Sequence, residues 1–332
     1  MPATHAPAGP TSNTIASIVV GTDFTPCSAV ALGQAIRIAK WFGATLHVVH
    51  VIDTTVVIEV ESALSPIQQG IRDGLVRDAE CAWAKFATQV LGDVEAAGLP
   101  IEVSVNNRIV GILRRAREDK ADLLVMGAFG DRRPDVGFGT VATACVRKSV
   151  ADVLLVRDTQ PGPFRTVVAA VDFSETSATV LARAALFAAQ DGAELHVLHV
   201  FAAPWHQLHY RALTPLVPPH LQMQYRDALE RRLAEFARPA LDAHAALRVR
   251  LAVYDYAGHR SGIVEYAGSV AADLVVLGTR GRTNLRDILL GSTAEKALAE
   301  SHSSILAVKP EGFAHPLASG EEPRLMKLRQ PA

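Results

Sequence analysis

Glycines and hydroxyl residues gather in one stretch near the C-terminal end of the sequence. Gly278 and Gly281 are followed, after nine further residues, by Gly291, Ser292 and Thr293. Glycine has no Cβ atom, so backbone N–H groups in such a loop can close around phosphate oxygens. A helix starting near Ser292 would add the positive end of its dipole, and the two hydroxyls could bind phosphate or Mg²⁺. The spacing therefore favours a phosphate-binding loop over a long turn that the glycines merely shape.

An aspartate stands upstream of this loop, and another occupies the matching place in the first half of the chain. Asp172 and Asp23 each follow a short apolar run that is typical of a buried strand. In a doubly wound sheet, ligands bind outside the carboxyl ends of the strands, where the strand order reverses. A carboxylate there can accept a hydrogen bond from a ribose hydroxyl or a base edge. The alternative role is to neutralise the start of the following helix, but recurrence in both halves favours binding.

The first half of the chain holds a shortened form of the glycine loop. Gly127 and Gly130 are followed by eight residues, rather than nine, before Gly139 and Thr140. Residues 131–135 include two aspartates, which place negative charge where a phosphate would sit, and two arginines that could offset it. Two interpretations stay open for this half. It could hold a second nucleotide site, or it could be a degenerate domain that is kept for pairing with the second half.

Other reactive side chains have simpler explanations. Cys27 stands next to a helix start, but its counterpart in the second half is Thr176, so no shared redox mechanism requires it. Four histidines fall on the second predicted strand of each half, and we expect satisfied core or strand-end residues there rather than ligands: His47, His50, His196 and His199.

The chain contains two copies of one unit. Four blocks match in the same order: residues 17–29 with 166–178, 44–51 with 193–200, 121–130 with 272–281, and 151–157 with 303–309. The offset grows from 149 to 151 and then to 152 residues. The last step is the residue missing from the first glycine loop. Duplication of a single unit explains all four matches.

Each copy alternates short apolar strands with amphipathic helices. Thr25 and Pro26 predict a helix start, since Thr is a good N-cap and Pro fits the first turn, and Ser174 takes the same place in the second copy. Such alternation implies right-handed crossovers and a parallel sheet covered on both faces. We therefore expect an α/β fold with two tandem, doubly wound, five-stranded parallel-sheet domains. In the first copy the predicted strands are 18–20, 46–51, 101–105, 123–126 and 153–156. The first predicted helix starts at residue 26, and the others cover 73–97, 110–118 and 141–148.

The segments between and around the copies differ from them in composition. The linker is polar and rich in Pro and Gly, and the two ends of the chain lack hydrophobic periodicity. Two insertions, 53–72 and 201–226, follow the second strands and could form lids or interface arms. The expected division is a tail at 1–13, a domain at 14–157, a linker at 158–164, a domain at 165–310 and a tail at 311–332.

Composition and charge exclude several classes of protein. A formal charge of −1, with no basic block, argues against a dedicated nucleic-acid or anionic-membrane binder. No apolar run approaches the roughly 20 residues that span a bilayer. The three cysteines lie far apart with no CxxC pattern, which argues against a disulfide framework or a zinc cluster. The N-terminal residues lack the charge and apolar pattern of a secretory signal, so we expect a cytoplasmic protein.

Four motifs of the second copy occur together: VDFS at 171–174, LHVLHV at 195–200, ADLVVLGTRG at 272–281 and LLGSTAEKAL at 289–298. With them the chain resembles the universal stress protein family in its tandem form, over about 14–157 and 165–310. The resemblance implies a Rossmann-like, adenine nucleotide alpha hydrolase-like fold with strand order 3-2-1-4-5 in each domain. ATP-binding members share the loop Gly-x2-Gly-x9-Gly-[Ser/Thr], which the second copy meets in full.

By that likeness the C-terminal half would bind ATP, or ADP or AMP, together with Mg²⁺. Asp172 and Val200 would hold the adenosine, and Leu277 and Gly278 would line the base and ribose. Mg²⁺ would be held through the phosphates, with Ser292 as the candidate protein ligand. The phosphates would be wrapped by Gly281, Gly291, Ser292 and Thr293. The corresponding residues of the first copy form the candidate second site: Asp23, Val51, Met126, Gly127, Gly130, Gly139 and Thr140.

The leading functional hypothesis is a nucleotide-binding regulatory protein of the stress response, acting on a protein partner that the sequence does not name. The alternatives are a slow ATPase on the same fold and a pairing scaffold that binds no nucleotide; there is no GxxxxGK[ST] loop. The resemblance also implies that the fifth strands, 153–156 and 305–308, meet antiparallel across a two-fold axis. The chain would then be an internal dimer, which could pair further as a homodimer.

Overall fold

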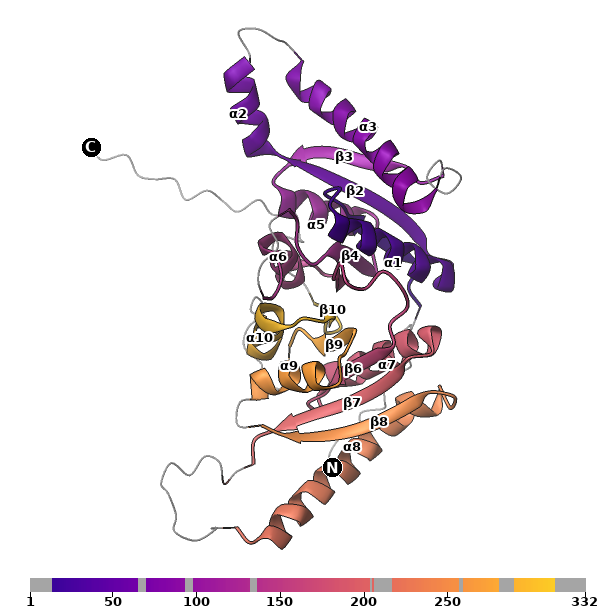
Figure 1. Ribbon diagram of the computed structural model, residues 1–332, viewed down its shortest axis with the longest axis vertical. Helices are drawn as coiled ribbons and strands as arrows, with labels where there is room; N and C mark the ends of the chain where they lie inside the picture. The colour runs from indigo at the N-terminus through magenta and orange to yellow at the C-terminus, as the bar shows by residue number, and fades with distance from the viewer. Residues whose placement is uncertain are drawn as a thin grey trace, which may run out of the picture.

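The computed structural model describes residues 14–64, 70–92, 98–131, 136–203, 205, 217–256, 259–280 and 290–313 (Figure 1). The first half contributes strands β1 (Ser17–Gly21), β2 (Thr45–Asp53), β3 (Ile101–Asn106), β4 (Leu123–Gly127) and β5 (Asp152–Val156). The second half contributes β6 (Thr166–Ala170), β7 (Glu194–Phe201), β8 (Arg248–Asp255), β9 (Leu274–Gly278) and β10 (Ser304–Val308).

These strands form one continuous sheet in the order β3-β2-β1-β4-β5-β10-β9-β6-β7-β8. Within each half all neighbouring strands are parallel and follow the order 3-2-1-4-5. The expected fold of two tandem five-stranded parallel sheets is therefore confirmed. In each half the strand order reverses between the first and fourth strands, so that is where a ligand crevice is expected.

Helices cover both faces of the sheet (Figure 1). One face is covered by α1 (Pro26–Phe42), α3 (Ile71–Leu91), α7 (Glu175–Asp191) and α8 (Pro219–Asp242). The other face is covered by α5 (Arg108–Glu118), α6 (Thr140–Lys148), α9 (His259–Ser269) and α10 (Ser292–Glu300). Each of the two apolar cores contains residues from both halves of the chain. The halves are thus continuous in packing as well as in hydrogen bonding.

Helix boundaries agree with the sequence patterns in some places and depart from them in others. The Thr25 side chain accepts a hydrogen bond from the Ser28 N–H and caps α1, as predicted. The helix predicted over 73–97 ends earlier, at Leu91, where Gly92 follows. The predicted insertion 53–72 contains an additional helix, α2 (Thr54–Leu64). No described helix combines the length and the apolar character that crossing a membrane requires.

The two halves join through an antiparallel ladder between β5 and β10. Leu306 pairs with Leu154, flanked by the pairs of Ile305 with Leu155 and Ala307 with Val153. This is the pairing that the resemblance implied. Because the junction is antiparallel while each half is parallel, the carboxyl ends of the two half-sheets point to opposite edges of the molecule.

Two basic residues, one from each half, donate hydrogen bonds to carbonyl oxygens of the other half. Arg157 and Lys309 directly follow β5 and β10, and both are buried. The Arg157 guanidinium donates to the carbonyl oxygen of Ser301, the C-cap of α10. The Lys309 ammonium donates to the carbonyl oxygen of Val146 in the last turn of α6. Each half therefore places a cation at the negative end of a helix that belongs to the other half.

The connection between the halves lies against α1. The Gln34 side chain, only 1% exposed, donates from Nε2 to the carbonyl oxygens of Gln160 and Gly162, at 2.9 and 2.6 Å. The expected linker is thus held on the surface of the first half rather than free of it.

Candidate functional site

The two predicted aspartates lie directly beyond the carboxyl ends of β6 and β1. Asp172 is half-buried, and its Oδ1 atom accepts hydrogen bonds from the Ser174 N–H (3.1 Å) and the Ser177 hydroxyl (2.6 Å). Asp23 accepts from the N–H and hydroxyl of Thr25, at 3.2 and 2.6 Å. Both carboxylates are thereby oriented by the N-terminal end of the helix that follows, including its N-cap residue.

The residue after each aspartate has an unusual backbone conformation that sequence reasoning missed. Phe173 has φ 62° and Phe24 has φ 63°, both in the left-handed region. A non-glycine residue there costs on the order of 1 kcal/mol or more, and such strain concentrates at functional sites. The signal available in the sequence was the matched Asp-Phe pair, but nothing in a phenylalanine predicts positive φ.

Histidines stabilise these strained turns. The rings of His199 and His50 contact the two phenylalanines, with centroids 4.3 and 4.5 Å apart. Their Nδ1 atoms donate to the carbonyl oxygens of Val171 and Thr22, each at 2.9 Å. Burial lowers the pKa of His50. The expectation of satisfied strand-end histidines agrees with this geometry.

The second glycine loop begins beside the first turn of α7, and its last residue returns to contact its first residues. A Cβ atom on Gly278 would lie 2.9 Å from Cγ2 of Thr176 and 3.1 Å from the carbonyl oxygen of Arg280. The Gly291 N–H donates to the Thr279 carbonyl oxygen at 2.9 Å. The two ends of the loop therefore meet at the end of β9. Gly281, between them, lies outside the described residues.

Helix α10 starts at this closure. Its N-cap, Gly291, supplies no side-chain hydrogen bond, and the first helical residue, Ser292, is exposed. Thr293 follows in the first turn and is half-buried. Because the N-cap glycine has no side chain, it leaves the N–H groups of this first turn for an anion to bind, and Ser292 stands beside them. The ends of the glycine loop and the start of α10 are thus next to one another, on the face of the sheet that α9 and α10 cover.

The first half repeats this arrangement. A Cβ atom on Gly127 would lie 3.1 Å from the backbone of Cys27, in the first turn of α1. The Gly139 N–H donates to the Ala128 carbonyl oxygen at 2.8 Å, and Thr140 starts α6. A Cβ atom on Gly130 would lie 2.8 Å from the Asp23 carboxylate. Here the structure brings the predicted aspartate and the glycine loop into direct proximity.

The first loop is also pressed against the second half of the molecule. Gly137 has φ 85°, and a Cβ atom there would lie 2.4 Å from the carbonyl oxygen of Ala299 in α10. Arg157 donates to the Gly137 carbonyl oxygen at 2.6 Å and lies over the ring of Phe138, 5.0 Å from its centroid. The far end of this eight-residue loop is therefore fixed by contacts with α10.

The remaining residues implied by the resemblance lie at the same two edges, but their side chains belong largely to the core on the second face. A Cβ atom on Gly262 in α9 would come within 2.5 Å of the Val200 side chain, and one on Gly111 in α5 within 2.8 Å of the Val51 side chain. These side chains can shape a site but offer little polar contact. The four are Val51, Val200, Met126 and Leu277.

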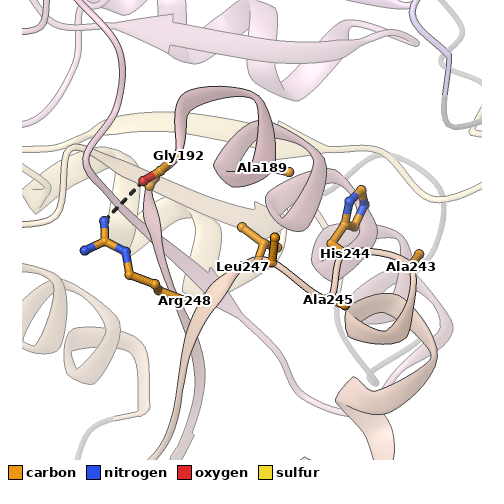
Figure 2. A pocket seen from close by; sticks show the side chains of 9 residues that line it. Ala189, Gly192, Ala243, His244, Ala245, Leu247 and Arg248 are labelled. Carbon is orange, nitrogen blue, oxygen red and sulfur yellow. Dashed lines mark hydrogen bonds between the residues drawn. The ribbon is translucent and has the colours of Figure 1, made fainter.

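A surface depression lies elsewhere, at the amino ends of β7 and β8 (Figure 2). Its lining includes Ala189 and Gly192 at the end of α7, and His244 and Leu247 beyond α8. Arg248 donates to the Gly192 carbonyl oxygen across it, at 3.2 Å. None of the predicted site residues lines this depression, and it is at the opposite ends of the strands from Asp172.

Comparison with known proteins assigns the family. The family model described as "Universal stress protein family" matches residues 14–157 and again residues 163–309. The chain belongs to the universal stress protein family. Universal stress protein Rv2623 of Mycobacterium tuberculosis is 25% identical over 312 residues, which cover 90% of this chain and 97% of that protein.

A solved structure that aligns with most of this chain supports the fold. A putative universal stress protein from Pseudomonas aeruginosa aligns with a TM-score of 0.60 and 18% identity, covering 92% of this chain and 98% of that one. A universal stress protein from Archaeoglobus fulgidus, solved in complex with dAMP, covers 45% of this chain and 100% of its own, with 17% identity and a TM-score of 0.32.

Proposed function

We propose that this universal stress protein binds ATP, with Mg²⁺, at the carboxyl edge of its C-terminal half, and that the bound nucleotide regulates its interaction with another protein in a stress response. The observation that carries the proposal is the juxtaposition, at one strand-order reversal, of Asp172, the ends of the second glycine loop and the start of α10, whose N-cap is a glycine. The partner and the location in the cytosol remain predictions.

The residues present fit such a ligand. Phosphate oxygens would accept hydrogen bonds from the N–H groups at the start of α10, and the dipole of that helix favours negative charge there. A carboxylate has several acceptor positions, so the Asp172 carboxylate, oriented by Ser174 and Ser177, can also accept a hydrogen bond from a ribose hydroxyl. Mg²⁺ would neutralise the phosphates, with the exposed Ser292 hydroxyl as its candidate protein ligand.

The first half has a matching aspartate, glycine loop and helix start, but its loop is one residue shorter and packs against α10 at Gly137. A phosphate group entering there would have to fit a loop whose far end is held at Gly137 by Arg157. We therefore propose that the C-terminal site binds more tightly, with the first half serving mainly in pairing.

Calorimetric titration of the nucleotide-free chain with Mg-ATP tests the proposal. We expect one ATP per chain. Gly281→Val combined with Gly291→Val should abolish binding, because a side chain at Gly291 would press on the Thr279 carbonyl oxygen, 3.3 Å from the Cβ position. The matched control, Gly130→Val with Gly139→Val, changes the first loop and should leave the stoichiometry at one.

Each other outcome has a clear meaning. Two ATP per chain would show that the eight-residue loop also binds. No binding of ATP or dAMP by the unaltered chain would overturn the proposal and favour the pairing scaffold. Phosphate release measured in the same samples would separate a binding protein from a slow ATPase.

A further inference from the structure

An aromatic strip runs through the second half towards the edge that holds Asp172. It consists of His196, Tyr266, Tyr254 and Tyr256. The Nδ1 atom of His196 is hydrogen-bonded to the Tyr266 hydroxyl at 2.9 Å. The Tyr266 and Tyr254 rings meet edge to face with centroids 5.6 Å apart, and Tyr254 stacks on Tyr256 at 5.8 Å and 17°. The buried end of the strip is His196 with Tyr266, and its half-exposed end is Tyr256, the residue after β8.

Tyr256 lies at the proposed site edge, on the side away from the phosphate loop. A Cβ atom on Gly262 would lie 2.5 Å from Cγ1 of Val200 and 3.0 Å from Cβ of Tyr256, so Tyr256 stands between the end of β7 and the start of α9. The strand sequence here is β9-β6-β7-β8. The end of β8 is therefore two strand spacings, about 10 Å, from the end of β6 and Asp172.

The strip also lies on the same face of the sheet as α10, where the proposed phosphate site begins. Tyr254 packs with the core that α9 and α10 cover, and α10 supplies the proposed phosphate-binding N–H groups. A nucleotide with its phosphates at the start of α10 and its ribose at Asp172 would extend its base along the strand ends towards Tyr256. Phosphate, sugar and base would then meet α10, β6 and β8 in turn.

The first half lacks these aromatic side chains. On Gly111, the counterpart of Gly262, a Cβ atom would lie 2.8 Å from Val51 and 3.4 Å from Cβ of Asn106, so Asn106 takes the place of Tyr256. Ser104 pairs with Val51 and takes the place of the second tyrosine. No phenol ring stands at either position.

The buried end of the strip differs in the same way. Arg115, on α5, takes the place of Tyr266 and forms ion pairs with Glu102 and Asp119. His47, the counterpart of His196, lies 3.3 Å from the Arg115 guanidinium. The equivalent region of the first half is therefore ionic where that of the second half is aromatic.

We propose that Tyr256, backed by Tyr254, is the wall on which the second site stacks the nucleobase, and that this wall directs adenine nucleotides to the second half. The inference rests on the proposed function and adds its base-recognition residue. An aromatic ring offers a π-face to any base, so the wall supplies affinity for the base while other groups select among bases.

The test is titration of the full chain, with Mg-ATP and AMP as nucleotides and ribose 5-phosphate as a ligand without a base. Tyr256→Ala should weaken ATP and AMP binding about tenfold or more. Tyr256→Phe keeps the ring and should bind within about twofold of the unaltered chain. The matched control is Asn106→Ala, the same position in the first half, which should leave binding unchanged.

Ribose 5-phosphate separates stacking from a structural effect, because it cannot stack on the ring. Its affinity should be the same in Tyr256→Ala as in the unaltered chain. Equal losses for AMP and ribose 5-phosphate, or ATP binding that Tyr256→Ala does not weaken, would overturn the inference while leaving the proposed function intact. Absence of nucleotide binding by the unaltered chain would overturn both.

Discussion

Lys309 shows how a single side chain at the junction can make stability depend on pH. The residue is 7% exposed, and burial lowers the pKa of its ammonium group to about 7 despite the opposing effect of Asp152. Nearby Arg280 lowers this pKa further. In the unfolded chain the lysine keeps its proton until about pH 10.5. Between pH 7 and 10.5 the unfolded state therefore binds more protons, so this group makes folding more favourable as pH rises.

Lys309→Met should remove that dependence. The free energy of unfolding of the unaltered chain, measured with urea at several pH values from 6 to 10, should rise relative to the variant by at most about 1.4 kcal/mol per pH unit. The control is Lys296→Met, which removes a partly exposed lysine paired with Glu300 on α10. Parallel profiles for the unaltered chain and Lys309→Met would contradict the assignment.

At the scale of elements, helix α10 connects two regions that are far apart in the sequence. It begins at the second glycine loop, and its C-terminal turn contacts Gly137 of the first loop. Arg157 joins that turn to the loop by donating to the carbonyl oxygens of Ser301 and Gly137. The shape of the first loop therefore depends on a helix of the other half.

Arg157→Met should destabilise the chain by about 2–3 kcal/mol, because both carbonyl oxygens would be left buried without this donor. The comparison is Arg147→Met, which breaks a half-exposed ion pair with Glu295 between α6 and α10 and should cost less than about 1 kcal/mol. Urea unfolding of the two variants provides the measurement. Equal losses of stability would show that Arg157 acts no differently from a surface ion pair.

Local patterns predicted most elements, because apolar alternation and helix caps depend only on residues that are close together in the sequence. Thr25 and Pro26 specified the start of α1, and the matched blocks specified eight of the ten described strands, all except β3 and β8. The aromatic strip was not predicted, since Tyr256 and Gly262 become neighbours of Val200 only once β8 lies beside β7. Arg157 could be aligned with Lys309, but its acceptors are backbone carbonyl oxygens, one of them in the other half, and no side-chain pattern identifies these.

At the scale of the whole molecule, the two half-sheets share a centre of fully buried strands. Leu154 and Leu306 are directly opposite one another in the antiparallel ladder, with exposures of 0% and 1%. The two candidate nucleotide sites lie at opposite edges because this junction is antiparallel.

Replacing Leu154 and Leu306 together by lysine should separate the halves or precipitate the protein, because two like charges would be buried face to face. We expect a larger hydrodynamic radius and a lower melting temperature, measured by gel filtration with light scattering and by calorimetry. The control replaces Val249 and Leu251 of β8, exposed by 37% and 40%, with lysine. Unchanged size and melting in the Leu154 and Leu306 variant would contradict the role of this ladder.

The short connection that Gln34 holds on α1 has a consequence for behaviour on dilution. Two separate copies of a half-sheet would associate by mass action and come apart when the protein is scarce. Here the chain between Val156 and Thr166 keeps the partner strands at an effective concentration that does not depend on how much protein is present. The complete ten-stranded sheet should therefore persist at nanomolar and micromolar abundance alike.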